Sequence, residues 1–395
     1  ELERFAPSLK ADMVKGNVQQ RKEVLDRWKE VDVLITSYDL LRRDITDYQE
    51  LHFFCEVIDE AQYIKNHGTQ AARAVKQVQT GFRLALTGTP IENRLSELWS
   101  IFDYLMPGYL YSYQRFRTEL EQPIVQHKDE DAAKRLQRLI RPFVLRRLKK
   151  EVLQDLPDKL EENLYADMDG EQQELYDVHV RRMKLMLEEK SDEEIRTDKI
   201  EILAELTRLR QLCCDPALLY DNYKGGSAKT ELVRGLIRNA VENGHKVLLF
   251  SQFTTMLERL YRILEEEKIA SHMLTGATPK EKRIEMVESF AHDEVPVFCI
   301  SLKAGGTGLN LTAADVVIHF DPWWNSAVQN QATDRAHRIG QKNVVNVYRI
   351  LAKGTIEEKI VELQERKLQL SDRILGGESL QAQGLTREEL LELLR

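Results

Sequence analysis

Residues 329–341 read Gln-Asn-Gln-Ala-Thr-Asp-Arg-Ala-His-Arg-Ile-Gly-Gln, and no other stretch of the chain says as much about fold and function. If this stretch is helical, Gln331, Arg335 and Arg338 stand at i, i+4 and i+7 and share one face. Two guanidinium groups aimed at one point suit a phosphoryl group whose charge spreads in a transition state. The alternative is a solvated, charged helix face, and two further stretches favour the phosphate interpretation.

Both of these stretches are apolar and end in residues suited to phosphate chemistry. Residues 55–62 read Cys-Glu-Val-Ile-Asp-Glu-Ala-Gln, which predicts a strand ending in the carboxylates Asp59 and Glu60. Residues 297–310 read Val-Phe-Cys-Ile-Ser-Leu-Lys-Ala-Gly-Gly-Thr-Gly-Leu-Asn, which predicts a buried strand that runs into a glycine-rich turn. Glycine allows the backbone to approach a phosphate closely.

Short apolar runs alternate with amphipathic segments along most of the chain. Runs of strand length occur at residues 32–37, 53–59, 83–87, 247–250, 272–274, 297–300, 316–320 and 344–351. Strands that alternate with helices predict an α/β fold with parallel sheets. Between about residue 161 and residue 228 the pattern is helical, which predicts an inserted helical segment.

Composition limits the class of protein. A chain of 395 residues with 42% hydrophobic residues can bury two or more cores. No run approaches the roughly 20 apolar residues that span a bilayer, so we expect no membrane partner. Four cysteines without Cys-x-x-Cys spacing predict buried thiols in a reducing compartment. The net charge of -8 does not exclude nucleic-acid binding, because residues 138–150 form a local basic patch.

Taken together and in this order, the motifs resemble the motor of superfamily-two helicase-like ATPases of the Swi/Snf type. Residues 59–62 (Asp-Glu-Ala-Gln) resemble the Walker B box of that family, and residues 86–90 (Leu-Thr-Gly-Thr-Pro) resemble its coupling motif. Residues 247–253, 302–310 and 329–341 resemble three motifs of its second lobe. The resemblance covers nearly the whole chain and is strongest to bacterial members, which implies a cytoplasmic protein that is nucleoid-associated if it is bacterial.

The resemblance implies two RecA-like lobes with parallel sheets, the first truncated at its N-terminus, and helical insertions between them. The expected domains are residues 1–160 (remainder of the first lobe, with the Walker B box and a helical protrusion), 161–228 (helical insertion and linker), 229–375 (second lobe with a brace helix) and 376–395 (tail). No Gly-x-x-x-x-Gly-Lys-Ser/Thr phosphate loop occurs in the sequence. We therefore expect the C-terminal portion of a larger ATPase, and no activity from this portion alone.

The resemblance also implies ATP and Mg²⁺ as ligands and assigns roles to residues. Asp59 would hold Mg²⁺, and Glu60 would orient and deprotonate the attacking water. Arg335 and Arg338 would act as arginine fingers. The residues expected to bind ATP or couple its hydrolysis are Gln62, Thr87, Gly88, Thr89, Gly306, Gly308 and Gln331. The residues expected to contact DNA are Thr36, Asn93, Arg94, Gln252, Thr275, Gly276, Ser301 and Lys303.

The implied function is ATP-dependent translocation on double-stranded DNA by a DNA-dependent ATPase that remodels protein–DNA complexes. One alternative is a strand-separating helicase or an ATPase that recycles RNA polymerase. Another is a non-catalytic DNA-binding or regulatory module. Double-stranded DNA is thus the expected partner, with RNA polymerase or other DNA-bound proteins as candidates.

Overall fold

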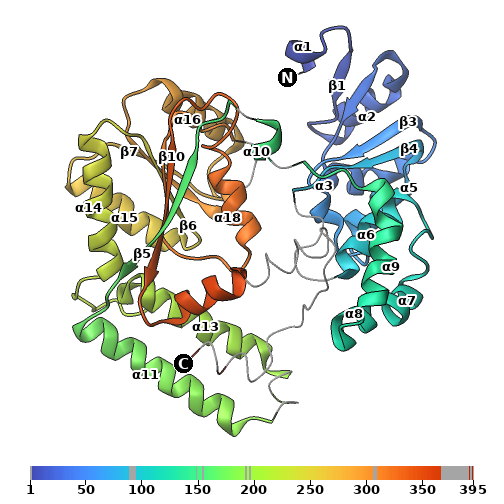
Figure 1. Cartoon of the computed structure of the whole chain (residues 1–395). Helices are drawn as coiled ribbons and strands as arrows, with labels where there is room; N and C mark the ends of the chain where they lie inside the picture. The colour runs from blue at the N-terminus through green and yellow to red at the C-terminus, as the bar shows by residue number, and fades with distance from the viewer. Residues whose placement is uncertain are drawn as a thin grey trace. The chain divides into compact units, whose positions relative to one another are not determined.

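The computed structural model describes residues 2–88, 95–147, 149–153, 155–191, 194, 197–305, 309–365, 391 and 394. The chain divides into two compact units, one of residues 1–144 and one that starts at residue 145 and continues to residue 369 (Figure 1). Each unit has its own strands and its own apolar core. In the described part of the chain, no helix combines the length and apolar character that a bilayer span requires.

The first unit contains two pairs of parallel strands. β1 (Ala11–Met13) pairs with β2 (Val33–Ile35), and β3 (His52–Ile58) pairs with β4 (Gln79–Ala85). The α-helices of this unit are α1 (Leu2–Phe5), α2 (Val18–Asp26), α3 (Tyr38–Arg43), α4 (Ile45–Tyr48), α5 (Gln70–Gln77), α6 (Leu95–Leu105), α7 (Tyr113–Phe116), α8 (Gln122–His127) and α9 (Glu130–Ile140). The predicted strands at 32–37, 53–59 and 83–87 are confirmed, with shifted ends, and β1 was not predicted.

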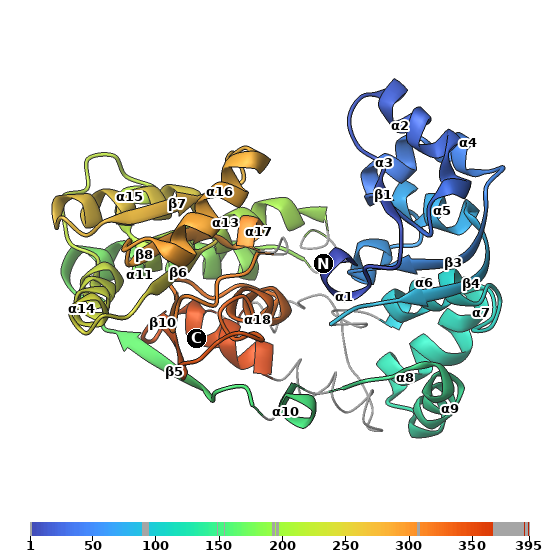
Figure 2. The same ribbon diagram turned by 90° about the horizontal axis from the view of Figure 1, so that it is seen from above.

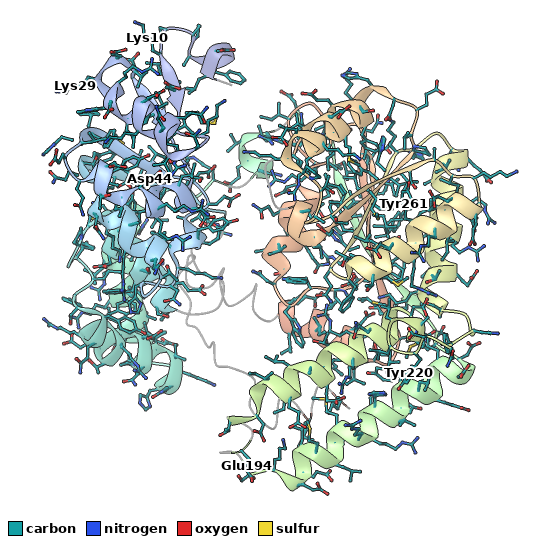
Figure 3. All side chains as sticks on the ribbon, turned by 180° about the vertical axis from the view of Figure 1, so that it is seen from behind. Lys10, Lys29, Asp44, Glu194, Tyr220 and Tyr261 are labelled. Atoms are coloured by element: carbon teal, nitrogen blue, oxygen red, sulfur yellow. The ribbon has the colours of Figure 1, made fainter. Side chains whose placement is uncertain are left out.

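A buried ion pair joins two helical segments of the first unit. The Arg21 guanidinium on α2 donates to both carboxylate oxygens of Asp44, at 2.6 and 2.8 Å. Asp44, labelled in Figure 3, lies between α3 and α4. Two parallel hydrogen bonds of this kind fix the geometry of both partners. The pair therefore sets the position of α2 relative to the end of α3.

The second unit is built on one parallel sheet in the order β5-β10-β9-β6-β8-β7. The strands are β5 (Lys159–Ala166), β6 (Val247–Ser251), β7 (Ser271–Leu274), β8 (Val297–Ser301), β9 (Val316–His319) and β10 (Val345–Ala352). Every residue of β6, β8 and β9 is buried. Their continuous apolar sequences are typical of central parallel strands that are covered on both faces.

Helices cover both faces of this sheet, as Figures 1 and 2 show. Leu249 and Ile318 face α14 (Ala228–Glu242) and α15 (Thr254–Glu266) in one apolar layer. Phe250 and Val317 face the opposite layer. That layer includes residues of α16 (Lys280–His292), α17 (Leu302–Gly305) and α18 (Ser326–Thr333). Alternating side chains along each strand thus supply two cores.

The division of the chain differs from the expected one at β5. The sequence pattern placed residues 161–228 in a helical insertion, yet residues 159–166 form a strand that pairs with β10 along its whole length. The helical part is a pair, α11 (Gly170–Glu189) and α13 (Lys199–Cys214), which share an apolar core with the helical residues 356–365. The rest of the predicted brace helix and the tail fall outside the described residues, apart from residues 391 and 394.

Candidate active site and nucleic-acid interface

The two predicted catalytic carboxylates lie directly after β3. Asp59 is exposed and Glu60 is half-buried. Glu60 has a left-handed backbone, with φ 50° and ψ 54°, and its N–H donates to Asp59 Oδ1 at 2.8 Å. A left-handed conformation costs a residue with a side chain about 1–3 kcal/mol. Neighbouring contacts must therefore hold this turn in place.

Gln62 provides such contacts by joining the acidic turn to the end of β4. Its Nε2 donates to Glu60 Oε2 at 2.6 Å, and Thr87 Oγ1 donates to Gln62 Oε1 at 2.9 Å. Ala61 N–H also donates to Leu86 O at 2.9 Å. The structure thus brings the predicted Walker B box and the start of the predicted coupling motif into one hydrogen-bonded cluster, although Gln62 and Thr87 are 25 residues apart.

Tyr38 belongs to the same cluster, although no sequence motif predicted it. Its hydroxyl donates to Asp59 O at 2.7 Å, and its ring stacks on that of Tyr63 with 5.5 Å between centroids. Burial raises the pKa of Tyr38, and the negative charges of Asp59, Glu56 and Glu60 raise it further. The hydroxyl therefore stays protonated and keeps its donor. The only signal in the sequence is a tyrosine shortly after a predicted strand.

The turn formed by Asp59 and Glu60, which we name the carboxylate turn, fits a magnesium ion. Among the residues that the structure describes, no three His, Cys, Asp or Glu side chains are grouped to hold a metal. Mg²⁺ does not need such a cage, because it keeps several waters and takes one or two carboxylates together with substrate phosphates. An exposed carboxylate at the end of a parallel strand, such as Asp59, meets that requirement.

The helical face predicted for Gln331, Arg335 and Arg338 is wrong. Helix α18 carries Gln331 but ends at Thr333, before either arginine. Both arginines lie in a segment of turns and bends, residues 334–341, which we name the arginine turn. Arg335 is buried and Arg338 is exposed, so the two guanidinium groups do not form one helical face.

Contacts with the neighbouring loop explain why the helix stops. Ala336 N–H donates to the carbonyl of Thr333, three residues back, at 3.0 Å. The Gln341 amide donates to the carbonyl of Ala314 at 2.8 Å, and Leu311 N–H donates to the carbonyl of Arg335 at 3.0 Å. Leu311 thus occupies the carbonyl that residue 339 would use in a longer helix, whereas His337 N–H still donates to the carbonyl of Thr333, four residues back, at 3.1 Å.

Four of the predicted DNA contacts lie along one edge of the second sheet. Gln252 follows β6, Thr275 and Gly276 follow β7, and Ser301 ends β8. These strands are adjacent in the order β6-β8-β7, so their carboxyl ends meet. Ligands of parallel α/β sheets bind beyond these ends. The sheet order therefore places the four residues where a ligand would lie.

Asp321 organises part of this edge and was not predicted. Ser251 Oγ and Gln252 N–H both donate to Asp321 Oδ1, at 2.5 and 3.2 Å, and Arg210 lies 3.6 Å from Asp321 Oδ2. Ser301 is 3% exposed, and its hydroxyl has no hydrogen-bond partner within the described ranges. A buried hydroxyl without a partner is costly, and a ligand at this edge could satisfy it.

The remaining predicted residues are placed only in part. Thr36 follows β2 in the first unit, and exposed Gly88 follows Thr87. Lys303 lies on α17. The other predicted contacts, Thr89, Asn93, Arg94, Gly306 and Gly308, fall outside the described residues.

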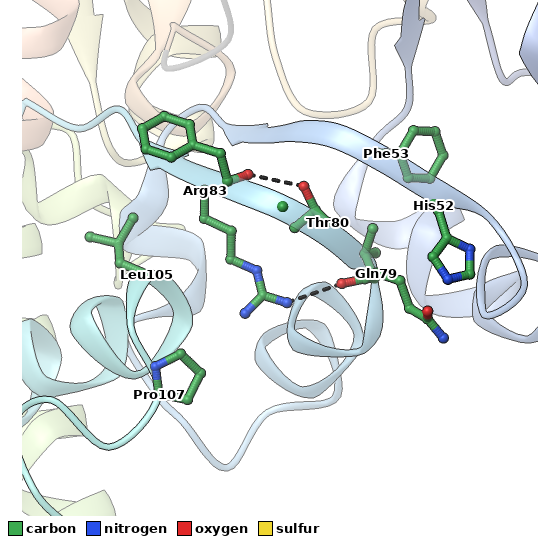
Figure 4. Close-up of a pocket in the computed structure, with 10 residues that line it drawn as sticks. His52, Phe53, Gln79, Thr80, Arg83, Leu105 and Pro107 are labelled. Carbon is green, nitrogen blue, oxygen red and sulfur yellow. Dashed lines mark hydrogen bonds between the residues drawn. The ribbon is translucent and has the colours of Figure 1, made fainter.

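A cavity of about 560 Å³ lies at the other end of β3 and β4 (Figure 4). Its walls include His52 and Gln79, which begin these strands. Arg83 crosses it and donates to the carbonyl of Val78 at 3.0 Å. None of the predicted ATPase residues line this cavity, so it is separate from the carboxylate turn.

The α/β units and the order of the motifs define the helicase-like class of proteins. Residues 1–218 match the family described as SNF2-related domain, and residues 228–340 match the helicase conserved C-terminal domain. The chain therefore belongs to the SNF2-related family, which confirms the Swi/Snf resemblance and the α/β fold class inferred from the sequence.

Two bacterial proteins and one solved structure are also similar to this chain. The chain is 39% identical to an uncharacterized ATP-dependent helicase of Mycoplasma genitalium, covering 100% of this chain and 37% of that protein. It is 40% identical to a putative ATP-dependent helicase/translocase of Bacillus subtilis, covering 100% and 43%. The Sulfolobus solfataricus SWI2/SNF2 ATPase core domain is 36% identical, with a TM-score of 0.50 and coverage of 100% and 80%. The chain spans about two fifths of the length of the two bacterial relatives.

Proposed function

We propose that the protein containing this chain is an ATP-dependent translocase on double-stranded DNA that moves or removes DNA-bound proteins without separating the strands. The observation that carries the proposal is the hydrogen-bonded cluster of Glu60, Gln62 and Thr87. Through Gln62, the cluster connects Glu60, which is suited to activate water, with Thr87, which follows the next strand. A shift in the position of one of these residues can therefore move the other. Membership of the SNF2-related family supports the same function.

The proposed chemistry divides among a few side chains. Glu60 accepts the proton of the water that attacks the terminal phosphorus of ATP, and the bond from that phosphorus to the bridging oxygen breaks. Asp59 would hold Mg²⁺, which would neutralise charge on the phosphates. Arg335 and Arg338 stabilise the negative charge that develops on the transferring group.

The DNA contacts proposed at the sheet edge suit phosphates rather than bases. Hydroxyl and amide groups, as in Ser301, Thr275 and Gln252, hydrogen-bond phosphate oxygens and position a protein without specifying sequence. We therefore propose binding that is indifferent to base sequence and sensitive to salt. RNA polymerase or another DNA-bound protein is the proposed object of remodelling, in the cytoplasm. The 395 residues alone, which contain no phosphate loop, are proposed to turn over no ATP.

The test is ATP turnover by the full-length protein with duplex or single-stranded DNA of unrelated sequences, across a salt series. We expect stimulation by every duplex and a stimulation that weakens as salt rises, because phosphate contacts release counterions. Turnover that no duplex stimulates would contradict the proposal. Stimulation by single strands alone would favour the strand-separating helicase.

A further inference from the structure

The segment that connects the first unit to the second sheet contacts the arginine turn through two side chains. This segment, residues 145–158, contains α10 (Lys149–Val152) and leads into β5. Lys149 Nζ donates to Asp334 Oδ1 at 2.5 Å and to the carbonyl of His337 at 3.0 Å. One ammonium group thus bonds to a side chain at the start of the arginine turn and to a carbonyl at its middle.

His337 makes the second contact, in the opposite direction. Its Nε2 lies 2.7 Å from the carbonyl oxygen of Pro157. A carbonyl can only accept, so Nε2 carries the proton and donates. His337 is 9% exposed, and Val345 N–H donates to the carbonyl of Asp158 at 3.0 Å beside it. The far end of the connecting segment is therefore fixed to the sheet as well as to the turn.

These contacts fall on the residue directly before each arginine. Asp334 immediately precedes Arg335, and His337 immediately precedes Arg338. Because α18 ends at Thr333, both arginines lie beyond the helix, and their N–H groups donate to carbonyls three and two residues back rather than four. A group that stabilises a transition state must be held within roughly 0.5 Å of its productive position. The Lys149 and His337 contacts supply part of that restraint.

Folding stability does not explain the Lys149 contact. The Lys149 and Asp334 side chains are 41% and 42% exposed. Ion pairs this exposed contribute little to folding, because water screens them and ordering both side chains costs entropy. The contact can nevertheless select one backbone position for the arginine turn.

We propose that Lys149 and His337 are positioning residues that hold the arginine turn in its catalytic conformation, so that the segment following the first unit controls hydrolysis. This inference rests on the proposed function, because it requires that Arg335 or Arg338 act on the phosphoryl group. Lys149 is the fifth residue after Val144, where the first unit ends. A change in the path of residues 145–149 would therefore reach the arginines through Lys149.

The test measures DNA-stimulated ATP turnover by the full-length protein with Lys149→Met. We expect kcat to fall about tenfold, as expected when catalytic groups are slightly misplaced. The KM for ATP and the midpoint of thermal unfolding should stay near the wild-type values. Lys149→Arg, which keeps the charge and the donors, should restore most of the kcat. The matched control is Lys134→Met, which removes an exposed lysine paired with Glu130 on α9 and should leave kcat unchanged.

Two further comparisons between variants separate positioning from a general effect on the protein. His337→Gln keeps an N–H donor and should retain more turnover than His337→Leu. In an Arg338→Ala background, Lys149→Met should have little further effect, because the group that it positions is gone. Equal kcat for Lys149→Met and Lys134→Met would overturn the inference, as would an undiminished Lys149→Met effect in that background. Full turnover by both Arg335→Ala and Arg338→Ala would instead overturn the proposed role of the arginines.

Discussion

The sheets of the two units differ in how their apolar faces are covered. In the second unit, Leu249 pairs with Cys299 and Ile318, and helices bury all three side chains completely. In the first unit, the paired residues Val57 and Leu84 are 53% and 42% exposed. Uncovered apolar surface of this kind lowers stability and favours association. We infer that the second unit folds independently and that the first unit is less stable than the second.

The largest expected effect concerns the chemistry assigned to the second unit. Arg335→Ala and Arg338→Ala, each in the full-length protein, should lower DNA-stimulated kcat by about 10³-fold or more, as arginine fingers do elsewhere. Nucleotide affinity should change far less, because the arginines contribute most once charge develops on the phosphoryl group. Pre-steady-state nucleotide binding and steady-state turnover would be measured together. Lysine at either position should rescue poorly, since it lacks the planar fork.

The next effect concerns the chemistry assigned to the first unit. Glu60→Gln should lower kcat by about 10²- to 10⁴-fold, because it removes a base and keeps the size of the side chain. ATP binding should persist, and so should the hydrogen bond with the Gln62 amide, which an amide oxygen can still accept. A steady-state assay that gave wild-type turnover would exclude Glu60 as the base. The division of chemistry between the units would then be wrong.

A smaller effect tests the difference in stability directly. Limited proteolysis of residues 1–395, read by mass spectrometry, should cleave the first unit before the second. Cleavage reports local opening, and a half-life about tenfold longer is expected for fragments of the second unit. Cleavage within the second unit before the first would show instead that the second unit is the less stable one.

The smallest effect is a pH dependence of folding stability that arises from Glu56 in the first unit. Burial raises the pKa of Glu56 from an ordinary value of 4.5 to about 7, although Arg83 opposes the shift. Between these values the folded protein holds a proton that the unfolded chain has released. Stability should therefore fall as pH rises through this window, by at most about 1.4 kcal/mol per pH unit.

Chemical unfolding of the wild type and of Glu56→Gln at pH 5.5, 6.5 and 7.5 would measure this dependence. The variant should lose the part of the slope that Glu56 causes, because its amide does not titrate. Identical slopes for the two proteins would show that Glu56 does not couple to folding.

In the second unit the sequence predicted the central strands and the edge strand β7, and it missed the other edge strand, β5. β6 and β8 are continuous apolar runs, and such runs are recognisable because parallel central strands need apolar side chains on both faces. β5 reads Lys-Leu-Glu-Glu-Asn-Leu-Tyr-Ala and was assigned to a helical insertion. Its partner, β10, lies far along the chain. No local pattern reveals such a pairing.

In the candidate site, too, only features with a local sequence pattern could be predicted. Asp59 and Glu60 were found because a carboxylate pair after an apolar strand is a local pattern. The end of α18 and the contact of Tyr38 with Asp59 were missed because each involves a hydrogen bond between residues far apart in the sequence. The helical spacing of Arg335 and Arg338 was a plausible local pattern that tertiary contacts overrode.

Motion along double-stranded DNA without strand separation can be measured in a triplex-displacement assay. The full-length protein would act on a duplex carrying a third strand, with ATP, beside a parallel assay for release of the duplex strands. We expect ATP-dependent loss of the third strand, an intact duplex, and no displacement by Glu60→Gln. DNA-stimulated hydrolysis without displacement of the third strand, or release of the duplex strands, would contradict it.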